Sequence, residues 1–462
     1  MINNIDISKL SIANRALQSD ESPKLFIETY GCQMNVNDSE VVISIMLQNG
    51  FQMTRDIKSA DLILINTCSI RENAEQRVRG RLSVFKGMKR KKPGLIIGVI
   101  GCMAERLKEK LLEEDKTVDL IAGPDAYRDL PSLVTIVGTG QKAANVLLSR
   151  EETYADISPV RLDENRVSAF ISIMRGCNNM CSYCVVPYTR GAERSRNPHT
   201  ILREAREILE AGYREVTLLG QNVNSFLWND ENGEVISFPR LMELIAQIDP
   251  HLRVRFATSH PKDLSDELLE VIKKYPNICK SIHLPAQSGS TSILEAMNRK
   301  YTRDWYLGRI AAIKEAIPEC SISTDLITGF CAETIEDHEL TLSLMREVSF
   351  DFAYMFKYSE RPGTFAERKL KDDIDENTKS QRLTEIINLQ SELSEKSKKK
   401  DIGKVFEVLI EGTSKKSKSE LFGRTSQNKV VVFPGTNHKP GEYVQVEIFS
   451  CTSATLKGSI VE

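Results

Sequence analysis

Three cysteines stand close together in the stretch MRGCNNMCSYCVVPYTRG, which runs from residue 174 to residue 191. Cys177, Cys181 and Cys184 are separated by three and then by two residues. A closed tetrahedral zinc site takes four ligands, and no fourth cysteine or histidine stands beside these three. Three thiolates can instead hold three irons of a [4Fe–4S] cluster and leave the fourth iron open. The spacing therefore favours a cluster that binds a further small ligand.

The alternative interpretation of this loop is a zinc site that recruits His199 as its fourth ligand. Zinc sites usually arrange their ligands in two tight pairs, which the spacing lacks. Three purely structural cysteines on one short loop fit the pattern less well than either metal centre.

A second set of cysteines is spread along the chain: Cys32, Cys68 and Cys102 are 36 and 34 residues apart. Each follows a short apolar run of the kind expected for a buried parallel strand. The three runs are 24–31, 62–66 and 95–101. Because the carboxyl ends of parallel strands share one edge of a sheet, these thiols are expected to converge. The placement predicts a second three-cysteine cluster or, as the alternative, three small buried side chains.

The other four cysteines lack such placement, and we interpret them as structural. They are Cys279, Cys320, Cys331 and Cys451.

The elements that must position these cysteines form two series. Strands and helices alternate from residue 24 to residue 138, which predicts an open, Rossmann-like α/β domain. After a predicted linker at 139–165, six strand–helix units begin at Ala169, and the first strand leads into the three-cysteine loop. Eight units close a full barrel, so six predict a partial (β/α)6 barrel or a doubly wound sheet.

The C-terminal region has a different pattern. An amphipathic helix is expected over 376–400. Five short strands broken by Gly, Pro and Asn follow it and predict a small antiparallel, OB-like β-barrel, a fold that often binds nucleic acid. The predicted division of the chain is a polar tail at 1–22 and domains at 23–139, 163–395 and 398–462.

Composition limits the class of protein. Of the 462 residues, 41% are hydrophobic and 27% are charged, with a formal net charge of −2, so the chain as a whole is not a polycation and RNA binding must come from local patches. No apolar run approaches the ~20 residues of a membrane helix, and the polar N-terminus lacks a signal-peptide pattern. We expect a cytoplasmic protein without membrane contact, in which ten cysteines are thiols or metal ligands.

With these motifs in view, the chain resembles the methylthiotransferase family of radical S-adenosylmethionine (SAM) enzymes. The resemblance covers essentially 24–462 and is closest to the branch that modifies isopentenylated adenosine in tRNA. One departure is Ala192, where that branch commonly has arginine. The motifs that carry the resemblance are YGCQMNVNDSE, RGCNNMCSYCVVPYTRG, LLGQNVNSF, HLPAQSGS, RPGTFA and GRTSQNKVVVFPG.

The resemblance implies a fold and two cofactors. It implies an N-terminal domain with an auxiliary [4Fe–4S] cluster held by Cys32, Cys68 and Cys102, a radical SAM barrel with a second [4Fe–4S] cluster, and a C-terminal TRAM domain. SAM would chelate the open iron of the barrel cluster and be cleaved to a 5′-deoxyadenosyl radical. Tyr183 resembles the residue that packs near the adenine, and 220–222 (Gly220, Gln221, Asn222) correspond to the place that holds the methionine amine.

The implied reaction replaces the C2 hydrogen of N6-isopentenyladenosine, directly 3′ of the anticodon, with a methylthio group. An aromatic C–H bond is too inert for acid–base chemistry, so no catalytic residue is assigned beyond the cluster ligands. Two SAM molecules per turnover, a flavodoxin- or ferredoxin-type electron donor and a monomeric enzyme are expected. The alternatives are a methylthiotransferase for a ribosomal-protein aspartate or for threonylcarbamoyl-adenosine and, in another class, a non-catalytic zinc and RNA-binding protein.

RNA contacts are expected from basic segments. The stretch 396–418 holds eight lysines and leads into the small barrel, and 79–92 holds seven basic residues and no acid, although it could be a solvated helix face. Phe226 and Trp228 are stacking candidates for a base that leaves its stack, or else ordinary loop packing. The individual candidates for RNA contact are Arg190, Arg194, Arg196, Lys415, Lys416 and Lys418.

Overall fold

The computed structural model describes residues 22–68, 72–163, 165–230, 233–415, 417, 419–435 and 437–461. The chain forms two compact units. Unit 1 contains the chain up to Leu162 and two later segments, Arg175–Asn178 and Val185–Arg194. Unit 2 contains the remainder. Cys177 therefore belongs to unit 1, while Cys181 and Cys184 belong to unit 2.

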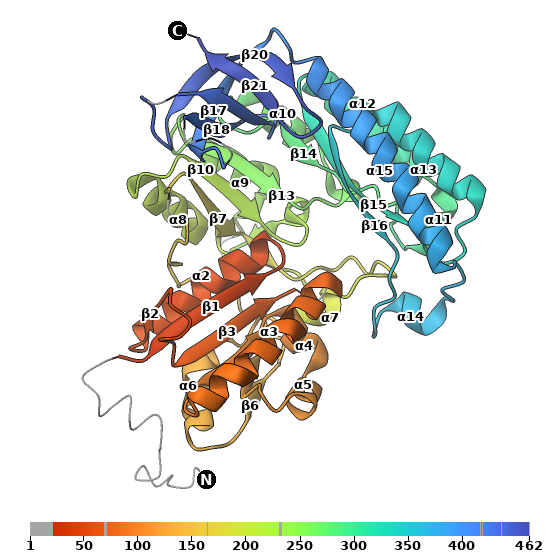
Figure 1. Cartoon of the computed structure of the whole chain (residues 1–462). Coiled ribbons are helices and arrows are strands. Elements are labelled where there is room, and N and C mark those ends of the chain that lie inside the picture. The colour runs from red at the N-terminus through yellow and green to blue at the C-terminus, as the bar shows by residue number, and fades with distance from the viewer. Residues whose placement is uncertain are drawn as a thin grey trace. The chain divides into compact units, whose positions relative to one another are not determined.

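Unit 1 is built on a parallel sheet, drawn in red to orange in Figure 1. In its described part the strand order is β2-β1-β3-β4-β5-β6, and every neighbouring pair is parallel. Three of these strands are the predicted apolar runs. The strands are β1 (Lys24–Tyr30), β2 (Gln52–Met53), β3 (Leu62–Thr67), β4 (Ile96–Ile100), β5 (Leu120–Ala122) and β6 (Ala143–Asn145).

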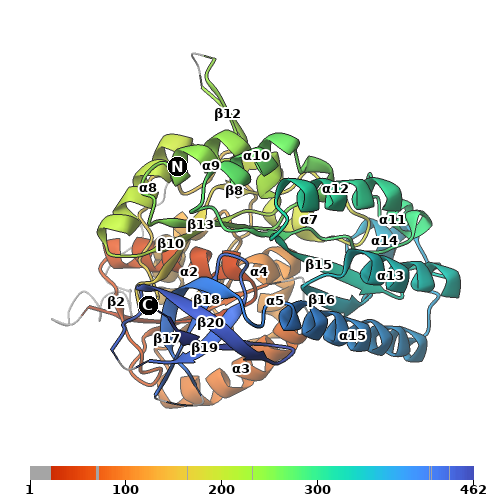
Figure 2. The same cartoon turned by 90° about the horizontal axis from the view of Figure 1, so that it is seen from above.

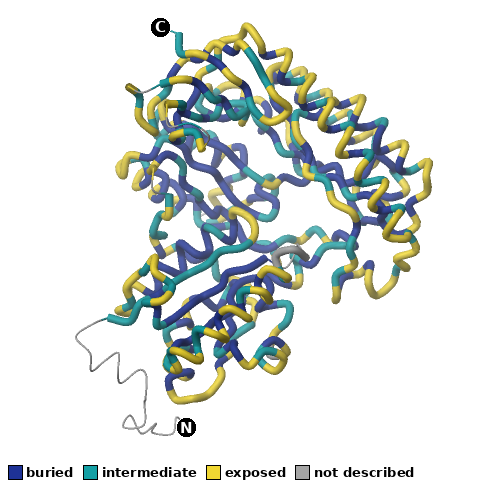
Figure 3. Tube along the Cα trace, viewed as in Figure 1, coloured by how far each residue is buried: buried dark blue, intermediate teal, exposed yellow. Residues whose placement is uncertain are grey.

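Helices cover both faces of this sheet, which is why its central strands are nearly continuous in apolar residues. Alternate residues of β3 enter different cores: Leu62 and Leu64 pack with α2 and α6, whereas Ile63 and Ile65 pack with α3, α4 and α5. Figure 3 shows β3 and β4 as buried along their length. The helices of unit 1 are α2 (Gln33–Gln48), α3 (Glu72–Lys91), α4 (Cys102–Leu107), α5 (Glu109–Glu114), η2 (Tyr127–Asp129), α6 (Leu130–Gly138) and α7 (Val186–Arg190).

The prediction of a linker at 139–165 is wrong for most of that segment. Strand β6 pairs with β5, and the side chains of Tyr154 and Ile157 are buried in the core that covers one face of the sheet. The Ser44 hydroxyl donates to the carbonyl of Ser158 and so fastens the segment to α2. A three-residue strand and isolated apolar side chains carry too little periodicity to be recognised in sequence.

Unit 2 begins with six parallel strands in two sheets, β7-β10-β13 and β14-β15-β16. A parallel bridge between Val254 of β13 and Ile278, just before β14, continues the series from one sheet to the other. Neighbours in space are thus neighbours in sequence, whereas a doubly wound sheet reverses its order at a switch point. The partial barrel is confirmed. Its strands are β7 (Ser168–Ser172), β10 (Glu215–Leu219), β13 (Arg253–Ala257), β14 (Ser281–His283), β15 (Ser321–Thr328) and β16 (Phe352–Lys357).

Amphipathic helices cover the outside of the partial barrel, and Figures 1 and 2 both show α13 and α15 side by side. Their buried faces complete the largest core. These helices are α8 (Pro198–Glu210), η3 (Val223–Ser225), α9 (Phe238–Ala246), η4 (Pro261–Asp263), α10 (Asp266–Lys274), α11 (Thr291–Ala296), α12 (Arg303–Ala316), α13 (Ile335–Val348), α14 (Phe365–Lys369) and α15 (Glu376–Lys399). The short strands are β8 (Met174–Arg175), β9 (Arg194–Ser195) and the antiparallel pair β11 (Leu227–Asn229) and β12 (Val235–Ser237).

The C-terminal strands close a barrel in the order β17-β18-β19-β21-β20, as predicted, although β19 and β21 pair in parallel. The strands are β17 (Val405–Thr413), β18 (Glu420–Thr425), β19 (Val430–Pro434), β20 (Tyr443–Cys451) and β21 (Leu456–Ile460). The barrel is fastened to the partial barrel by Arg253 and Arg255 of β13. Their guanidinium groups donate to the carbonyls of Arg424 and Thr425 at 2.8 Å in both cases.

Candidate functional site

The three dispersed cysteines converge in unit 1, as the strand pattern predicted. Cys32 follows β1 and caps the N-terminus of α2, Cys68 follows β3, and Cys102 is the first residue of α4 after β4. The Cys32 and Cys68 thiols are hydrogen-bonded, and Cys102 interacts electrostatically with Cys32. Because β1, β3 and β4 are adjacent in the sheet, their carboxyl ends bring the thiols to one edge.

A glycine precedes each helix-starting cysteine and lets the backbone turn sharply. Gly31 and Gly101 have positive φ angles of 142° and 88°. A Cβ atom on Gly101 would lie 2.5 Å from Asn66 Oδ1. Asn66 in turn donates to the carbonyl of Asn35, whose side-chain oxygen accepts from the backbone N–H of Cys32. A buried amide network therefore holds two of the cysteine turns together.

The thiols have unequal electrostatic surroundings. The hydrogen bond with Cys68 and the charge of Arg190 lower the pKa of Cys32 to about 6 against the effect of burial. Burial raises the pKa of the Cys102 thiol, and Arg190 opposes that effect. The Arg190 Nε–H donates to Cys102 Sγ at 3.2 Å. Cationic groups and helix N-termini stabilise thiolates, which are the form that binds iron.

In unit 2, the turn after α11 holds the second half of the three-cysteine loop. The backbone N–H of Ser182 donates to the carbonyl of Met297 at 3.0 Å, and Asn298 donates to the carbonyl of Met180 at 2.7 Å. Arg299, buried in the same turn, donates from Nη1 to Cys181 Sγ at 3.3 Å. The backbone N–H of Cys184 donates to the carbonyl of Cys181.

Cys177 lies in unit 1, where its N–H donates to the carbonyl of Gly191 at 3.2 Å. Gly176 before it has a φ of 77°, and a Cβ there would lie 2.0 Å from the carbonyl oxygen of Ala192. Glycine before cysteine is thus a feature shared by both sets, and it is visible in the sequence.

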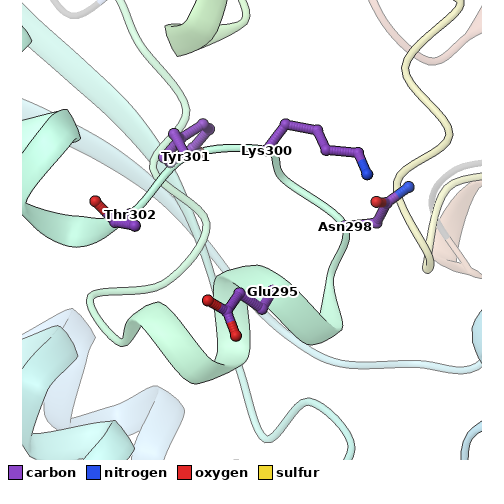
Figure 4. Close-up of a pocket in the computed structure, with 5 residues that line it drawn as sticks. All are labelled: Glu295, Asn298, Lys300, Tyr301 and Thr302. Carbon is purple, nitrogen blue, oxygen red and sulfur yellow. The ribbon is translucent and has the colours of Figure 1, made fainter.

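A hollow of about 310 Å³ adjoins this turn in unit 2. Figure 4 shows Glu295 of α11 on one side of it and the turn with Asn298, Lys300, Tyr301 and Thr302 around it. Asn298 and Lys300 have positive φ angles of 57° and 62°, which are uncommon for residues with a side chain. The hydrogen bond from Asn298 to Met180 links the hollow to the cysteine loop.

The predicted SAM-contacting residues lie at the carboxyl ends of the first barrel strands. Gly220 follows β10, where a Cβ would lie 2.4 Å from the Met174 side chain. Gln221 Oε1 is buried without a hydrogen-bond partner among the described residues. Both polar atoms of Asn222 are engaged, with Asp263 at 2.7 Å and the N–H of His260 at 2.9 Å, which favours the role of a turn residue. The Tyr183 ring meets Phe330 edge-on.

Two further buried atoms at these strand ends also lack partners among the described residues: Ser172 Oγ, at the end of β7, and Asn224 Nδ2, after β10. Buried polar atoms normally have partners. Together with Gln221 Oε1, they give unit 2 an unused set of hydrogen-bonding groups that fits a polar ligand.

The structure corrects the prediction that three arginines contact RNA. Arg190, Arg194 and Arg196 are all buried and engaged within the protein. Arg190 pairs with Asp38 at 2.7 Å, Arg194 pairs with Asp125 at 3.0 Å, and Arg196 pairs with Glu204. The physical reason is that a guanidinium binds a buried carboxylate with the same forked geometry that suits phosphate.

The remaining RNA candidates are divided. Lys415 is exposed in the turn between β17 and β18, whereas Lys416 and Lys418 lie outside the described residues. Phe226 is buried in the barrel core, so it packs there and is not available to stack on a base. Trp228 packs against the same core and meets the His199 ring edge-on.

In the basic segment 79–92, several side chains pair with acidic residues, which favours a solvated helix face over an RNA contact. Arg81 pairs with Glu28, Lys89 pairs with Asp119, and Lys92 lies 2.7 Å from Asp61.

Sequence reasoning missed several functional candidates. Asp38, on α2, accepts from Arg175 at 2.9 Å and from Arg190 at 2.7 Å. Burial opposes its ionisation, but the two arginines hold the pKa of its carboxyl below the usual value. Arg299, beside Cys181, was also missed, since nothing local distinguishes it from a surface arginine.

Two findings concern what the described residues lack. No three His, Cys, Asp or Glu side chains among them are arranged to hold a single metal ion. Each thiolate of a [4Fe–4S] cluster binds a different iron, so its ligands are not arranged around one ion, and the thiol-rich donor set fits such a cluster. Within the same residues, no helix has the length and apolar character needed to cross a membrane.

Comparison with protein-family models gives three matches. Residues 24–123 match the uncharacterized protein family UPF0004, 171–345 match the radical SAM superfamily, and 399–461 match the TRAM domain. The partial barrel, its cysteine loop and the second of these matches define a radical SAM enzyme.

Full-length relatives are more specific. The chain is 59% identical over 447 residues to a tRNA-2-methylthio-N(6)-dimethylallyladenosine synthase from Parabacteroides distasonis, with 97% of each chain covered. It is 58% identical to the protein of that name from Amoebophilus asiaticus, over 94% of this chain and 92% of the relative, and 54% identical to that from Porphyromonas gingivalis, over 99% of each. The chain belongs to the family of tRNA-2-methylthio-N(6)-dimethylallyladenosine synthases.

Solved structures with a similar fold are more distant in sequence. The radical SAM methyltransferase TsrM from Kitasatospora setae matches with a TM-score of 0.55 at 12% identity, over 72% of this chain and 73% of that chain. The cobalamin-dependent radical enzyme OxsB matches with a TM-score of 0.52 at 12% identity, over 80% of this chain and 56% of that one. These matches support the fold.

Proposed function

We propose that the chain replaces the C2 hydrogen of N6-isopentenyladenosine, directly 3′ of the anticodon of tRNA, with a methylthio group. The observation that carries this proposal is the identity of 54–59% to synthases of that name over nearly the whole of both chains. Two SAM molecules are used per turnover, one as methyl donor and one as radical source. The product is 2-methylthio-N6-isopentenyladenosine.

Six cysteines are assigned as ligands of two [4Fe–4S] clusters. Cys177, Cys181 and Cys184 hold the radical SAM cluster, which their spacing supports. Cys32, Cys68 and Cys102 hold the auxiliary cluster, supported by their convergence at one sheet edge. When bound, the two clusters supply the electron for SAM cleavage and the site that holds the transferred sulfur.

The chain's own residues bind and orient SAM at the carboxyl ends of β7 and β10. Gly220 leaves room for close approach, and the unpartnered atoms of Ser172, Gln221 and Asn224 supply hydrogen bonds. Tyr183, beside Phe330, offers an aromatic edge for the adenine. Asn222 orients this turn through Asp263 and His260.

The anticodon stem-loop is bound in part by the C-terminal barrel, where Lys415 is exposed on a turn. Lys416 and Lys418 stay predictions that lie outside the described residues. The enzyme acts as a monomer in the cytoplasm, where its tRNA substrate is found, and it receives electrons from a flavodoxin- or ferredoxin-type protein. The domain boundaries 23–139, 163–395 and 398–462 also stay predictions.

The test uses anaerobically reconstituted protein with isopentenylated tRNA, SAM and a strong reductant. Cys177→Ala is expected to abolish 5′-deoxyadenosine formation. Cys32→Ala is expected to retain it but to form no methylthio nucleoside. Cys451→Ala, in the small barrel, is the control and keeps both activities.

Two results would contradict the proposal. Methylthio product from Cys32→Ala would overturn the division between the clusters. An unchanged tRNA nucleoside profile in a strain that lacks the gene would overturn the choice of substrate and favour one of the other methylthiotransferase activities.

A further inference from the structure

A buried ion network lies beside the three converging cysteines of unit 1. Asp38 accepts from Arg175 and Arg190, while Asp125 accepts from Arg194 at 3.0 Å and lies 3.6 Å from Arg175. All five side chains are at most 5% exposed. Three guanidinium groups face two carboxylates, so the network carries an excess of positive charge. Buried charges normally occur in balanced sets, and this excess requires an anion.

Arg190 is the member of the network that faces the cysteines. Its Nη2 donates to Asp38 and its Nε donates to Cys102 Sγ at 3.2 Å. Its Nη1 is buried and has no hydrogen-bond partner among the described residues. Leaving a buried donor unpaired is unfavourable. A spare donor and a spare positive charge at the same guanidinium both point to an anionic group at the cysteines.

An iron–sulfur cluster held by three thiolates is such a group, because thiolates and sulfides are negatively charged and accept hydrogen bonds. Two arginines of the network come from segments next to the three-cysteine loop. Arg175 immediately precedes Gly176 and Cys177, and Arg190 ends α7, which follows Cys184. One carboxylate, Asp38, thus holds the two segments that flank the three-cysteine loop against the helix that begins at Cys32.

We propose that Arg190 is a positioning residue for the auxiliary cluster, and that its charge, balanced by Asp38, sets the reduction potential of that cluster. The inference rests on the proposed function only for the presence of a cluster on Cys32, Cys68 and Cys102. Hydrogen bonds to cluster sulfurs and nearby charges are known determinants of cluster potentials. The redox step is the uptake of one electron by the cluster from an external reductant, with no bond made or broken.

The sign of the effect follows from electrostatics. The added electron increases the negative charge of the cluster, and a neighbouring cation stabilises the reduced state. Arg190→Gln removes that cation and lowers the potential. Asp38→Asn removes the anion that balances Arg190 and raises it. A purely structural role of either residue would loosen the same packing and shift both variants in one direction.

The experiment uses the full chain with Cys177→Ala, Cys181→Ala and Cys184→Ala as the parent, so that only the auxiliary cluster is observed. Dithionite titrations in the presence of mediators, followed by electron paramagnetic resonance, give the midpoint potential, and iron analysis gives the cluster content. A tenfold change in the redox equilibrium, expected with opposite signs in Arg190→Gln and Asp38→Asn, corresponds to about 59 mV for one electron.

The control is Arg128→Gln, which also removes a positive charge from unit 1. Arg128 pairs with Glu152 and Asp156 at the surface, so this variant should keep the parent potential. If Arg190→Gln holds no iron, Arg190→Lys and Asp38→Asn decide the matter. Lysine keeps the charge, so it should give a potential near that of the parent, and Asp38→Asn should still lie above it.

The outcomes separate the two proposals. A parent that binds no cluster overturns the assignment of Cys32, Cys68 and Cys102, and with it this inference. A parent with a cluster whose potential is unchanged in Arg190→Gln, or shifted in the same direction by Arg190→Gln and Asp38→Asn, overturns the role of Arg190 alone.

Discussion

Arg255 is predicted to hold the C-terminal barrel against the partial barrel. It lies on β13, buried, and its guanidinium makes three hydrogen bonds. Nε donates to Glu215 of β10 at 2.8 Å, Nη2 to the carbonyl of Thr425 at 2.8 Å, and Nη1 to that of Ser426 at 3.3 Å. Arg255→Met keeps the apolar stem of the side chain and removes all three bonds. The variant therefore tests whether this one group docks the domain.

The magnitude follows from what remains after the substitution. Glu215 is 5% exposed and keeps a hydrogen bond from the Ser168 hydroxyl at 3.2 Å, but its buried charge is left without a cation. Removing one partner of a buried ion pair costs about 3–5 kcal/mol. Because about 1.4 kcal/mol is a factor of ten, local opening of the barrel interface should become roughly two to three and a half powers of ten more frequent.

Hydrogen exchange measures that opening directly. Amides of β18 and of the turn after it should exchange faster by this factor in Arg255→Met, while those of β3 and β4 in unit 1 should not change. Adding Glu215→Gln should recover part of the protection, because it removes the unpaired charge. Formation of the methylthio nucleoside should fall, while 5′-deoxyadenosine formation without tRNA persists.

Arg240→Ala is the matched control, because Arg240 forms a partly exposed pair with Glu243, and such pairs contribute at most about 1 kcal/mol. If Arg255→Met exchanged no faster than Arg240→Ala, the three hydrogen bonds would not be what docks the barrel. If Glu215→Gln failed to restore protection, the energy estimate, which assumes that Glu215 is left as an unpaired buried charge, would be wrong.

Three further predictions concern single positions. Gly101→Ala places a Cβ at a φ of 88° against Asn66, and it should lower stability by about 2 kcal/mol and reduce bound iron. The control, Gly87→Ala, lies in open space on α3 and should raise stability by up to about 1 kcal/mol. Thermal unfolding and iron analysis measure these effects. Burial, with Arg299 and Lys262, lowers the pKa of His260 to about 2. The unfolded chain therefore takes up a proton as the pH falls below about 6.5, while the folded chain does not. Below that pH the free energy of unfolding of wild type should fall by up to about 1.4 kcal/mol per pH unit relative to that of His260→Asn. Above about pH 7.5 the difference between the two should not change with pH. Lys415→Gln should reduce the salt dependence of tRNA binding by about 0.7–0.9 in the log–log slope, the effect of one phosphate contact; an unchanged slope would remove Lys415 from the interface.

The sequence could predict the convergence of Cys32, Cys68 and Cys102 because it follows from topology. The strands before Cys68 and Cys102 are buried on both faces, and such strands give continuous apolar runs that are easy to recognise. The strand before Cys32 is only partly buried. Once the runs are parallel neighbours, their carboxyl ends must share an edge. No knowledge of side-chain packing is needed for that step.

The shorter elements of unit 1 could not be predicted in the same way. Strands β2, β5 and β6 contain two or three residues each, which is too few to establish a period of two. Their pairing is decided by neighbouring strands and by the cores on both faces. The segment after β6 resembles a linker for the same reason, since its buried residues, Tyr154 and Ile157, lack a regular spacing.

The arginines near the cysteines show a different limit. Arg175 and Arg190 are 137 and 152 residues from Asp38 in sequence, so no local pattern reveals the pairing. The start of α2 nevertheless contains a clue, because Asn35, Asn37 and Asp38 are buried there. A polar helix start inside a domain must find donors and charges elsewhere in the chain. The arginines that flank the cysteine loop meet that requirement, and for this reason they are not free to bind RNA.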